Sequence, residues 1–168
     1  MRKVLFPGTF DPFHYGHLDI ARRASKLFDL VVVAVYDKPS KSLLFEPEVR
    51  IQLTQQAVAG LEGIEVVGYS GMTVAYAKKI GAQAIVRGLR VFSDFEYEFR
   101  IALANRRLDK EIDTIALITG EENTFLSSST VKEIASLGGD VSSMVPPHVN
   151  IALKERYAAA DQTEFHRC

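Results

Sequence analysis

The chain has 168 residues, 47% of them apolar, and its 20 Lys and Arg nearly match its 21 Asp and Glu, for a formal net charge of −1. This length predicts one domain, and the apolar fraction excludes a disordered or disulfide-rich protein. The near-neutral charge excludes a global basic field that would recruit nucleic acid. A single cysteine, Cys168, excludes an internal disulfide and a cysteine zinc cluster.

The sequence also lacks the marks of a membrane or exported protein. No run reaches the roughly 18 consecutive apolar residues that a membrane span needs. The charged start at residues 1–3 leads directly into an apolar run that is too short for a signal peptide. A single cysteine fits a reducing compartment. We therefore expect a soluble cytoplasmic protein that binds neither nucleic acid nor membranes.

Short apolar runs alternate with segments of helical periodicity along the chain. We expect strands at 4–6, 30–36, 64–68, 83–86 and 114–118. We expect helices at 16–28, 47–60, 73–80, 94–108, 130–137 and 147–157. Unbroken apolar runs such as LVVVAVY are typical of parallel strands covered on both faces. The pattern predicts an α/β fold with an open, mostly parallel sheet of about five strands and helices on both faces.

The ends of this pattern define the expected domain. Residues 1–157 are expected to form one domain, with a polar loop at 37–45. Residues 158–168 lack apolar periodicity, and we expect them to fray.

Polar segments follow four of the predicted strands. PGTFDPFH follows the first strand, DKPSK the second, RGLR the fourth and TGEENTFLSSS the fifth. Because open α/β sheets bind ligands at the carboxyl ends of their strands, these segments predict a site at that edge. The sequence has no Walker A, GxGxxG or GxSxG motif, which argues against a P-loop enzyme, a dinucleotide dehydrogenase and an α/β-hydrolase.

The segment His14-Tyr15-Gly16-His17 begins the first predicted helix and holds two of the four histidines. Residues three apart share one face of a helical turn, and the N–H groups at a helix start bind anions. Gly16 would let a flat ring or a phosphate approach the backbone. The alternative is a helix cap that carries two surface imidazoles.

Two arginines at the end of a buried strand are candidate phosphate ligands. The guanidinium forks of Arg87 and Arg90 suit phosphate oxygens. The alternative is a solvated basic turn that balances Asp94, Glu96 and Glu98 at the next helix start.

A lysine and a run of hydroxyls complete the candidate site. Lys41 lies in a polar loop, where a lysine is usually solvated. It is a candidate site residue only because of the other polar segments. Thr130 with Glu133 fits a capping box. Capping needs one hydroxyl, so the other hydroxyls in 127–130 indicate a second phosphate cradle.

These groups supply more donors and positive charge than one phosphate monoester requires, which predicts a nucleoside triphosphate and a second anionic substrate. The chain shows no activated nucleophile, and a phosphate monoester is already largely dianionic at pH 7. We therefore predict nucleotidyl transfer, catalysed by orientation and charge stabilisation in an in-line displacement.

The segment GTFDPFHYGH resembles the T/H-x-G-H signature of the nucleotidylyltransferase superfamily. With PSK at 39–41, RGLR at 87–90, DFEYE at 94–98 and LSSS at 126–129, the chain resembles the phosphopantetheine adenylyltransferase family over about residues 3–157. The resemblance implies a Rossmann-like sheet and a homohexamer of two trimers. It implies transfer of the adenylyl group of ATP to 4′-phosphopantetheine with Mg²⁺, giving dephospho-coenzyme A and pyrophosphate in coenzyme A synthesis, and feedback by coenzyme A.

The resemblance also implies roles for individual residues. In catalysis, His17 would stabilise the transition state, together with Lys41 and Arg90. On the phosphopantetheine side the implied contacts are Thr9, Lys41, Thr73 and Arg87. On the ATP side they are Thr9, Phe10, His17, Gly88, Leu89, Arg90, Glu98, Asn123, Thr124, Phe125, Leu126, Ser127, Ser128 and Ser129. Mg²⁺ would be carried by the ATP phosphates, with no side-chain ligand.

Three other functions remain open from the sequence. Nicotinate mononucleotide adenylyltransferases share a similar GTFDP start, but the short chain and the RGLR and DFEYE segments argue against this function. A cytidylyltransferase shares the histidine signature but usually ends in an RTxGISTS segment, which is absent here. A non-catalytic nucleotide- or coenzyme A-binding regulator would be favoured by loss of His17 or of either arginine, and all three residues are present.

Overall fold

A computed structural model describes residues 1–38 and 42–165 of the chain. The strands are β1 (Lys3–Gly8), β2 (Leu30–Tyr36), β3 (Ile64–Tyr69), β4 (Ala84–Leu89) and β5 (Asp113–Ile118). The helices are α1 (Tyr15–Leu27), α2 (Pro47–Val58), α3 (Thr73–Lys79), α4 (Phe92–Leu108), the short 3-10 helix η1 (Glu121–Asn123), α5 (Ser128–Ser136) and α6 (Pro147–Phe165).

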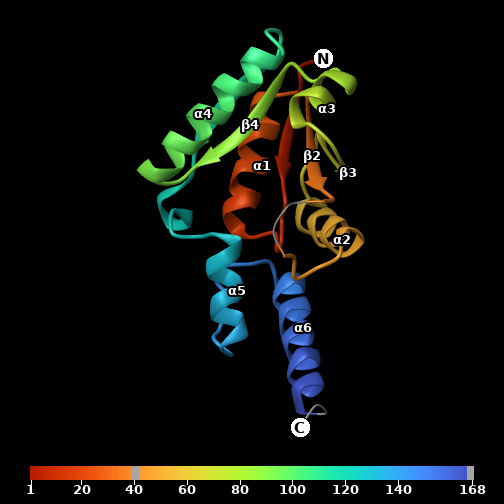
Figure 1. Cartoon of the computed structure of the whole chain (residues 1–168), viewed down its shortest axis with the longest axis vertical. Helices are drawn as coiled ribbons and strands as arrows, with labels where there is room; N and C mark the ends of the chain where they lie inside the picture. Colours follow the sequence, from red (N-terminus) through yellow and green to blue (C-terminus); the bar gives the residue numbers. More distant parts are fainter. Residues whose placement is uncertain (39–41, 166–168) are drawn as a thin grey trace.

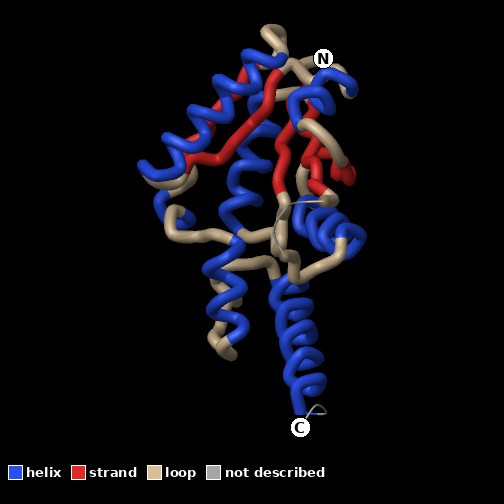
Figure 2. Tube along the Cα trace, in the orientation of Figure 1, coloured by secondary structure: helices blue, strands red, loops and turns tan. Residues whose placement is uncertain are grey.

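The strands form one parallel sheet in the order β3-β2-β1-β4-β5. Figure 1 and Figure 2 show the sheet between its helices. Side chains of α1 and α2 pack on one face, whereas side chains of α3 pack on the other. The predicted α/β class, with an open parallel sheet covered on both faces, is therefore confirmed.

The central strand β1 explains why the strand sequences are apolar without alternation. Successive side chains of a strand point to opposite faces of the sheet. Val4 and Phe6 lie in the cluster that contains Ile20 of α1, whereas Leu5 lies in the cluster that contains Val74 of α3. Because both faces are covered, the interior positions of β1 favour apolar residues.

A third apolar cluster lies beyond the carboxyl ends of the strands. Phe45 and Leu53 of the α2 region pack against Val131 of α5 and against Val149 and Leu153 of α6. Figure 1 shows α5 and α6 below the sheet, with α6 leading to the C-terminus. Among the described residues no helix, including the 19-residue α6, is long and apolar enough to cross a lipid bilayer.

Several predicted boundaries differ from the structure, and three of the differences have a clear local reason. The strand predicted to end at residue 86 continues to Leu89, so Arg87 lies within β4. Helix α5 begins at Ser128 because Ser127, not Thr130, caps it by accepting the Thr130 N–H at 3.0 Å. Helix α6 runs eight residues beyond the predicted end at 157, through alanines 158–160, which have the highest helix propensity.

The double-sided core predicts which apolar side chains stabilise the fold. Leu5 is fully buried in the central strand, whereas Leu137 is 82% exposed. We expect Leu5→Ala to lower the free energy of unfolding by about 2–5 kcal/mol, because it leaves a cavity. Leu137→Ala should change it by less than about 0.5 kcal/mol. Urea denaturation measures both, and equal losses would contradict this description of the core.

Candidate active site

The candidate site forms where β1 and β4 separate. β1 pairs with β2 along its six residues but with β4 only at Val4–Ala84 and Leu5–Ile85. Pro7 accounts for the difference, because it has no N–H to donate. Its carbonyl instead accepts a hydrogen bond from Arg87 Nη1 at 3.0 Å. Beyond these pairs lies a cavity of about 350 Å³ at the carboxyl ends of the strands.

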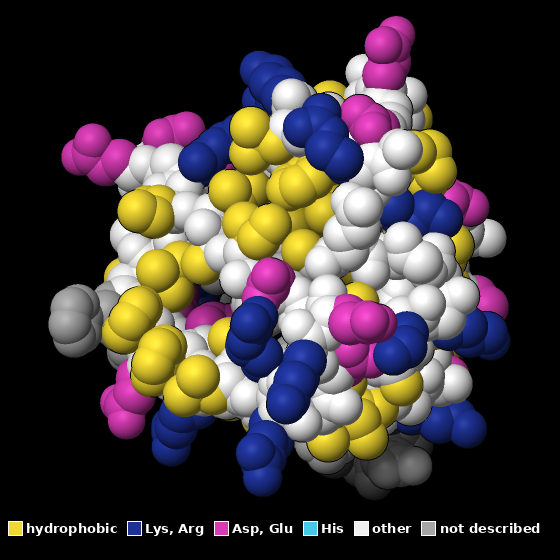
Figure 3. Space-filling view, turned by 90° about the horizontal axis from the view of Figure 1, so that it is seen from above, with side chains coloured by type: hydrophobic (Ala, Val, Ile, Leu, Met, Phe, Trp, Pro, Cys, Tyr) yellow, Lys and Arg dark blue, Asp and Glu magenta, His cyan; other side chains and the backbone are white. Residues whose placement is uncertain are grey.

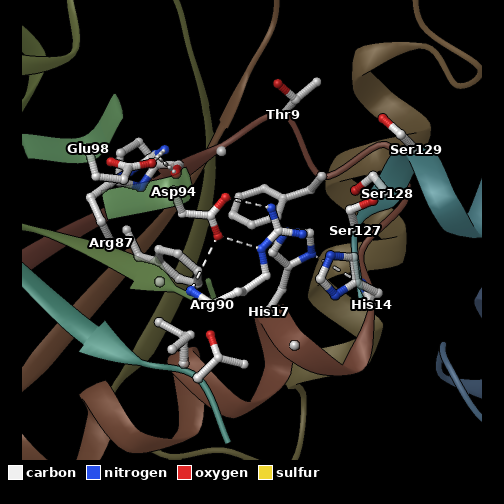
Figure 4. Close-up of a pocket in the computed structure, with 18 residues that line it drawn as sticks. Thr9, His14, His17, Arg87, Arg90, Asp94, Glu98, Ser127, Ser128 and Ser129 are labelled. Carbon is white, nitrogen blue, oxygen red and sulfur yellow. Dashed lines mark hydrogen bonds and ion pairs between the residues drawn. The ribbon is translucent and has the colours of Figure 1, made fainter. Parts of the chain in front are cut away.

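Segments far apart in the sequence line this cavity, as Figure 4 shows. Ten of the predicted site residues line it: Thr9, Phe10, His17, Arg87, Gly88, Arg90, Glu98, Ser127, Ser128 and Ser129. The resemblance gave no role to the other lining residues, which are Phe6, Pro7, Gly8, His14, Gly16, Ile20, Asp94 and Thr119. The expectation that the polar segments converge on one edge is therefore confirmed for those after β1, β4 and β5.

Several predicted site residues do not line this cavity. Lys41 lies outside the described residues, and its role stays a prediction. Among the described residues, six predicted site residues do not line the cavity: Thr73, Leu89, Asn123, Thr124, Phe125 and Leu126. Thr73 instead exchanges a hydrogen bond with the Tyr69 hydroxyl at 3.0 Å. Asn123 lines a second cavity, of about 310 Å³, beside the outer side of α1.

The two histidines of the first helix form a stack. His14 is the N-cap of α1, and its backbone N–H donates to His17 Nδ1 at 3.2 Å. A ring nitrogen that accepts a hydrogen bond carries no proton, so the proton of His17 lies on Nε2. The two rings lie 3.6 Å apart at 22°. His17 is thus held as a neutral N–H donor.

Burial keeps the supporting ring of the stack uncharged. His14 is only 4% exposed, so the alternative of two surface imidazoles is wrong. Burial, with a smaller contribution from the nearby Arg90, lowers the pKa of His14 to about 3. Its Nδ1 is buried and has no hydrogen-bond partner among the described atoms. The neutral ring of His14 therefore stacks on His17 without placing a positive charge beside it.

Phe10 forms another wall around His17. Its ring meets the His17 ring edge-on, with centroids 4.9 Å apart, and its backbone φ is +50°. The ring also folds back over Gly8, where an added Cβ would lie 2.7 Å from Phe10 Cζ. A glycine at position 8 is therefore what allows Phe10 to reach His17.

Each arginine of the site forms a bidentate ion pair with a carboxylate of α4. Arg87 binds Glu98 through Nε at 2.8 Å and Nη2 at 2.6 Å. Arg90 binds Asp94 through Nε at 2.9 Å and Nη2 at 3.1 Å, as the dashed lines in Figure 4 mark for this pair. Nη1 of Arg87 donates to the Pro7 carbonyl, and Nη1 of Arg90 to that of Leu126. These bonds use three of the five N–H groups of each guanidinium, which leaves donors for a ligand.

These pairs correct the expectation of a positively charged crevice. Burial opposes the charge on Arg87, but the bond to Glu98 outweighs it and raises the pKa of Arg87. Burial likewise opposes ionisation of Asp94, but Arg90 outweighs it and lowers the pKa of Asp94. Among the described lining residues the two positive charges are therefore cancelled by two negative ones. The cavity is rich in directed donors and not in net charge.

The start of α5 adds main-chain donors to the cavity rim. The Ser128 hydroxyl donates to the Pro12 carbonyl at 2.9 Å, which ties α5 to the turn after β1. Ser127 is occupied as the cap, through bonds to the backbone and the hydroxyl of Thr130. The first N–H groups of a helix have no intrahelical acceptor and suit phosphate oxygens.

Comparisons with known proteins identify the family of the chain. A family model described as cytidylyltransferase-like matches residues 5–134. A phosphopantetheine adenylyltransferase from Desulfitobacterium hafniense (strain Y51) is 49% identical over 157 residues, covering 94% of this chain and 96% of the relative. One from Gloeobacter violaceus is 51% identical, with 94% and 98% covered. The chain belongs to the phosphopantetheine adenylyltransferase family.

A solved structure supports the fold independently of these relatives. It is titled a putative nicotinate-nucleotide adenylyltransferase from Vibrio parahaemolyticus and is 22% identical to this chain. The two superpose with a TM-score of 0.69, over 91% of this chain and 99% of the other. At this identity the likeness concerns the fold alone.

The buried His14 predicts a specific pH dependence of stability. The unfolded His14 has its ordinary pKa of 6.5 and the folded one about 3. Between these values the unfolded chain binds the extra proton, so stability is complete above 6.5 and falls as the pH drops. From pH 7 to pH 5.5 we expect wild type to lose about 1 kcal/mol more than His14→Gln. Urea denaturation at each pH measures this, and parallel curves would show that His14 is not the cause.

Proposed function

We propose that the chain transfers the adenylyl group of ATP to 4′-phosphopantetheine, giving dephospho-coenzyme A and pyrophosphate in coenzyme A biosynthesis. The observation that carries this proposal is the match to phosphopantetheine adenylyltransferases over nearly the whole chain, with 49% identity over 94% of its length. The cavity supports it, because a neutral N–H donor, two guanidinium groups and a helix start surround one space. These are donors suited to phosphate groups.

In the proposed reaction a phosphate oxygen of the acceptor attacks the α-phosphorus of ATP and pyrophosphate leaves. The acceptor phosphate is largely dianionic at pH 7, so no side chain has to remove a proton. His17 Nε2–H would donate to the α-phosphate as negative charge develops there. Arg90 would bind ATP, while Arg87 and Lys41 would hold the acceptor phosphate, so that the two reactants are aligned.

The remaining predicted contacts belong to the same proposal. Thr9 would touch both reactants, and Thr73 would line the pantetheine arm. The contacts proposed for ATP are Phe10, Gly88, Leu89, Glu98, Asn123, Thr124, Phe125, Leu126, Ser127, Ser128 and Ser129. Arg87 is a proposed contact of the acceptor, and Glu98 is a proposed contact of ATP. The ion pair between them supports the proposal that the two substrates bind next to each other.

Mg²⁺ would enter with the triphosphate. Among the described residues no group of three or more His, Cys, Asp and Glu side chains could hold a metal ion. The carboxylates that line the cavity, Asp94 and Glu98, each bind an arginine through both oxygens. This donor set fits a Mg²⁺ that keeps water and phosphate oxygens as its ligands and supplies charge neutralisation when bound.

We also propose a homohexamer of single-domain subunits spanning residues 1–157, located in the cytoplasm. Exposed apolar side chains on α4 support self-association: Phe95, Phe99 and Leu103, which share one face of the helix, are each about half exposed. Figure 3 shows hydrophobic side chains gathered on the side where α4 lies. Coenzyme A shares the pantetheine arm and would bind in competition with the substrate. Sedimentation at six times the monomer mass is the expected result for the assembly.

The function is tested by pyrophosphate release with ATP, Mg²⁺ and one acceptor at a time. Release only with 4′-phosphopantetheine, with dephospho-coenzyme A identified by mass, is the expected result. Release with nicotinate mononucleotide would keep the mechanism and overturn the substrate. ATP binding without turnover of either acceptor would favour a non-catalytic regulator.

His17 is expected to act mainly in the transition state. His17→Ala should lower kcat by about a hundredfold, the effect of losing one donor to a developing charge, with little change in ATP affinity. His17→Asn is the matched variant, because its amide oxygen can still accept the His14 N–H while its shorter side chain does not reach the position of Nε2. Both variants should show a similar fall in kcat. A fall in ATP affinity as large as the fall in kcat would contradict the assigned role.

The two arginines are expected to serve different substrates. Arg90→Lys should raise KM for ATP, and Arg87→Lys should raise KM for 4′-phosphopantetheine. Each change loses charge-assisted hydrogen bonds worth about 1.5–3 kcal/mol, or roughly ten- to a hundredfold. Lysine is preferred to alanine because it keeps a cation beside Asp94 or Glu98. Steady-state kinetics with each substrate varied measures the effect, and identical changes in both variants would refute the division.

A further inference from the structure

Arg50 is a buried charged side chain that the proposed reaction does not use. It lies in the first turns of α2 and is the largest of the fully buried side chains. Its guanidinium donates to four main-chain carbonyls, those of Tyr36 at 2.7 Å, Thr9 at 2.8 Å, Phe45 at 3.1 Å and Asp37 at 3.4 Å. One side chain thus supplies hydrogen bonds to three separate segments of the main chain.

These carbonyls place Arg50 at the junction between the sheet and the site. Thr9 follows β1, Tyr36 ends β2, and Phe45 lies just before α2. A guanidinium is planar and presents its five N–H groups in fixed directions. It can satisfy these acceptors together only if the segments keep one relative arrangement. Arg50 therefore fixes the start of the β1–α1 turn relative to β2 and α2.

Asp11 holds the same turn from its other side. It is 1% exposed, and its carboxylate accepts the backbone N–H groups of Leu44 at 2.9 Å and Phe45 at 3.0 Å. Lys132 of α5 also donates to it, at 2.9 Å. The main chain is thus anchored immediately before and immediately after Phe10.

The residue between these anchors has an unfavourable backbone conformation. Phe10 has a φ of +50°, which bulky side chains rarely adopt and which persists only when the surroundings determine it. Thr9 lines the cavity, and the Phe10 ring meets His17 edge-on at 4.9 Å. A shift of this turn would therefore move a predicted phosphate contact and a wall of the His17 site together.

We propose that Arg50 is a positioning residue for adenylyl transfer, which fixes the Thr9 carbonyl and so holds the β1–α1 turn against His17. This inference rests on the proposed function. Stability alone does not account for Arg50, because a buried cation is costly to desolvate and an apolar side chain of similar size often serves a core as well. What an apolar side chain cannot do is fix four carbonyls in one geometry.

The test compares Arg50→Lys with Thr54→Val. Lysine keeps the charge but has no planar fork, so it cannot bind all four carbonyls. Thr54 is equally buried one turn further along α2, and its hydroxyl donates to the Arg50 carbonyl at 2.8 Å without reaching the turn. Steady-state kinetics for both substrates and thermal melting are measured for each variant, at a temperature where it is folded.

We expect Arg50→Lys to lower kcat by about ten- to a hundredfold while KM for ATP changes little, as for a misplaced reacting group. Thr54→Val should lower the melting temperature and keep kcat. A purely structural role would lower the melting temperature in both variants and leave kcat unchanged, which would overturn the inference.

Two further controls keep the outcomes distinct. If Arg50→Lys does not fold, the kcat of Asp11→Asn is measured instead, because this substitution loosens the same turn from its other side. A fall in its kcat would support the inference, and wild-type kcat would overturn it. If the wild-type protein forms no dephospho-coenzyme A, the proposed function and this inference both fail. Activity in wild type with unchanged kcat in Arg50→Lys removes the inference alone.

Discussion

The loss of pairing between β1 and β4 is the constraint on which the site depends. Pro7 offers an acceptor but no donor toward β4, so the two strands pair only at their beginnings. β2 lies on the other side of β1, and β5 on the other side of β4, so the sheet order changes direction between β1 and β4. Such a switch point is where an open α/β sheet forms a ligand crevice. Here the Arg87 guanidinium bridges the two strands and lines the resulting cavity.

The cavity binds through geometry more than through net charge. Each guanidinium is oriented by a carboxylate on one face of α4, where Asp94 and Glu98 are one turn apart. The pairing cancels charge but fixes the direction of the remaining N–H groups. Donors that are already oriented need no reorganisation when a negative charge develops nearby. The long-range attraction of anionic ligands is therefore weaker than two unpaired arginines would give. Discrimination between ligands by their shape is stronger.

The sequence predicted the type and order of the helices and strands because both signals are local. Unbroken apolar runs mark strands buried on both faces, and turn residues mark the ends of elements. It also predicted the edge of the sheet where the site lies. The alternative that acidic residues of the next helix balance the two arginines named Asp94 and Glu98 correctly, but it did not give the individual pairs, because Arg87 and Glu98 are brought together only by the packing of α4. Arg50 gave no signal either, since an arginine in a helix is normally exposed. One residue in the sequence could have indicated that β1 separates from β4, namely Pro7, which lies within the first strand.

Several locally unfavourable features lie close to His17. Phe10 has a positive φ, at a cost of order 1–3 kcal/mol. His14 Nδ1 is buried without a hydrogen-bond partner among the described atoms, which costs about 1–3 kcal/mol more. Each feature contributes to the position of His17, since the rings of Phe10 and His14 both contact its ring. A side chain packed by aromatic rings on several sides has few accessible rotamers. The apolar clusters on both faces of the sheet offset these costs, so the stability of the core is what permits the strained geometry of the site.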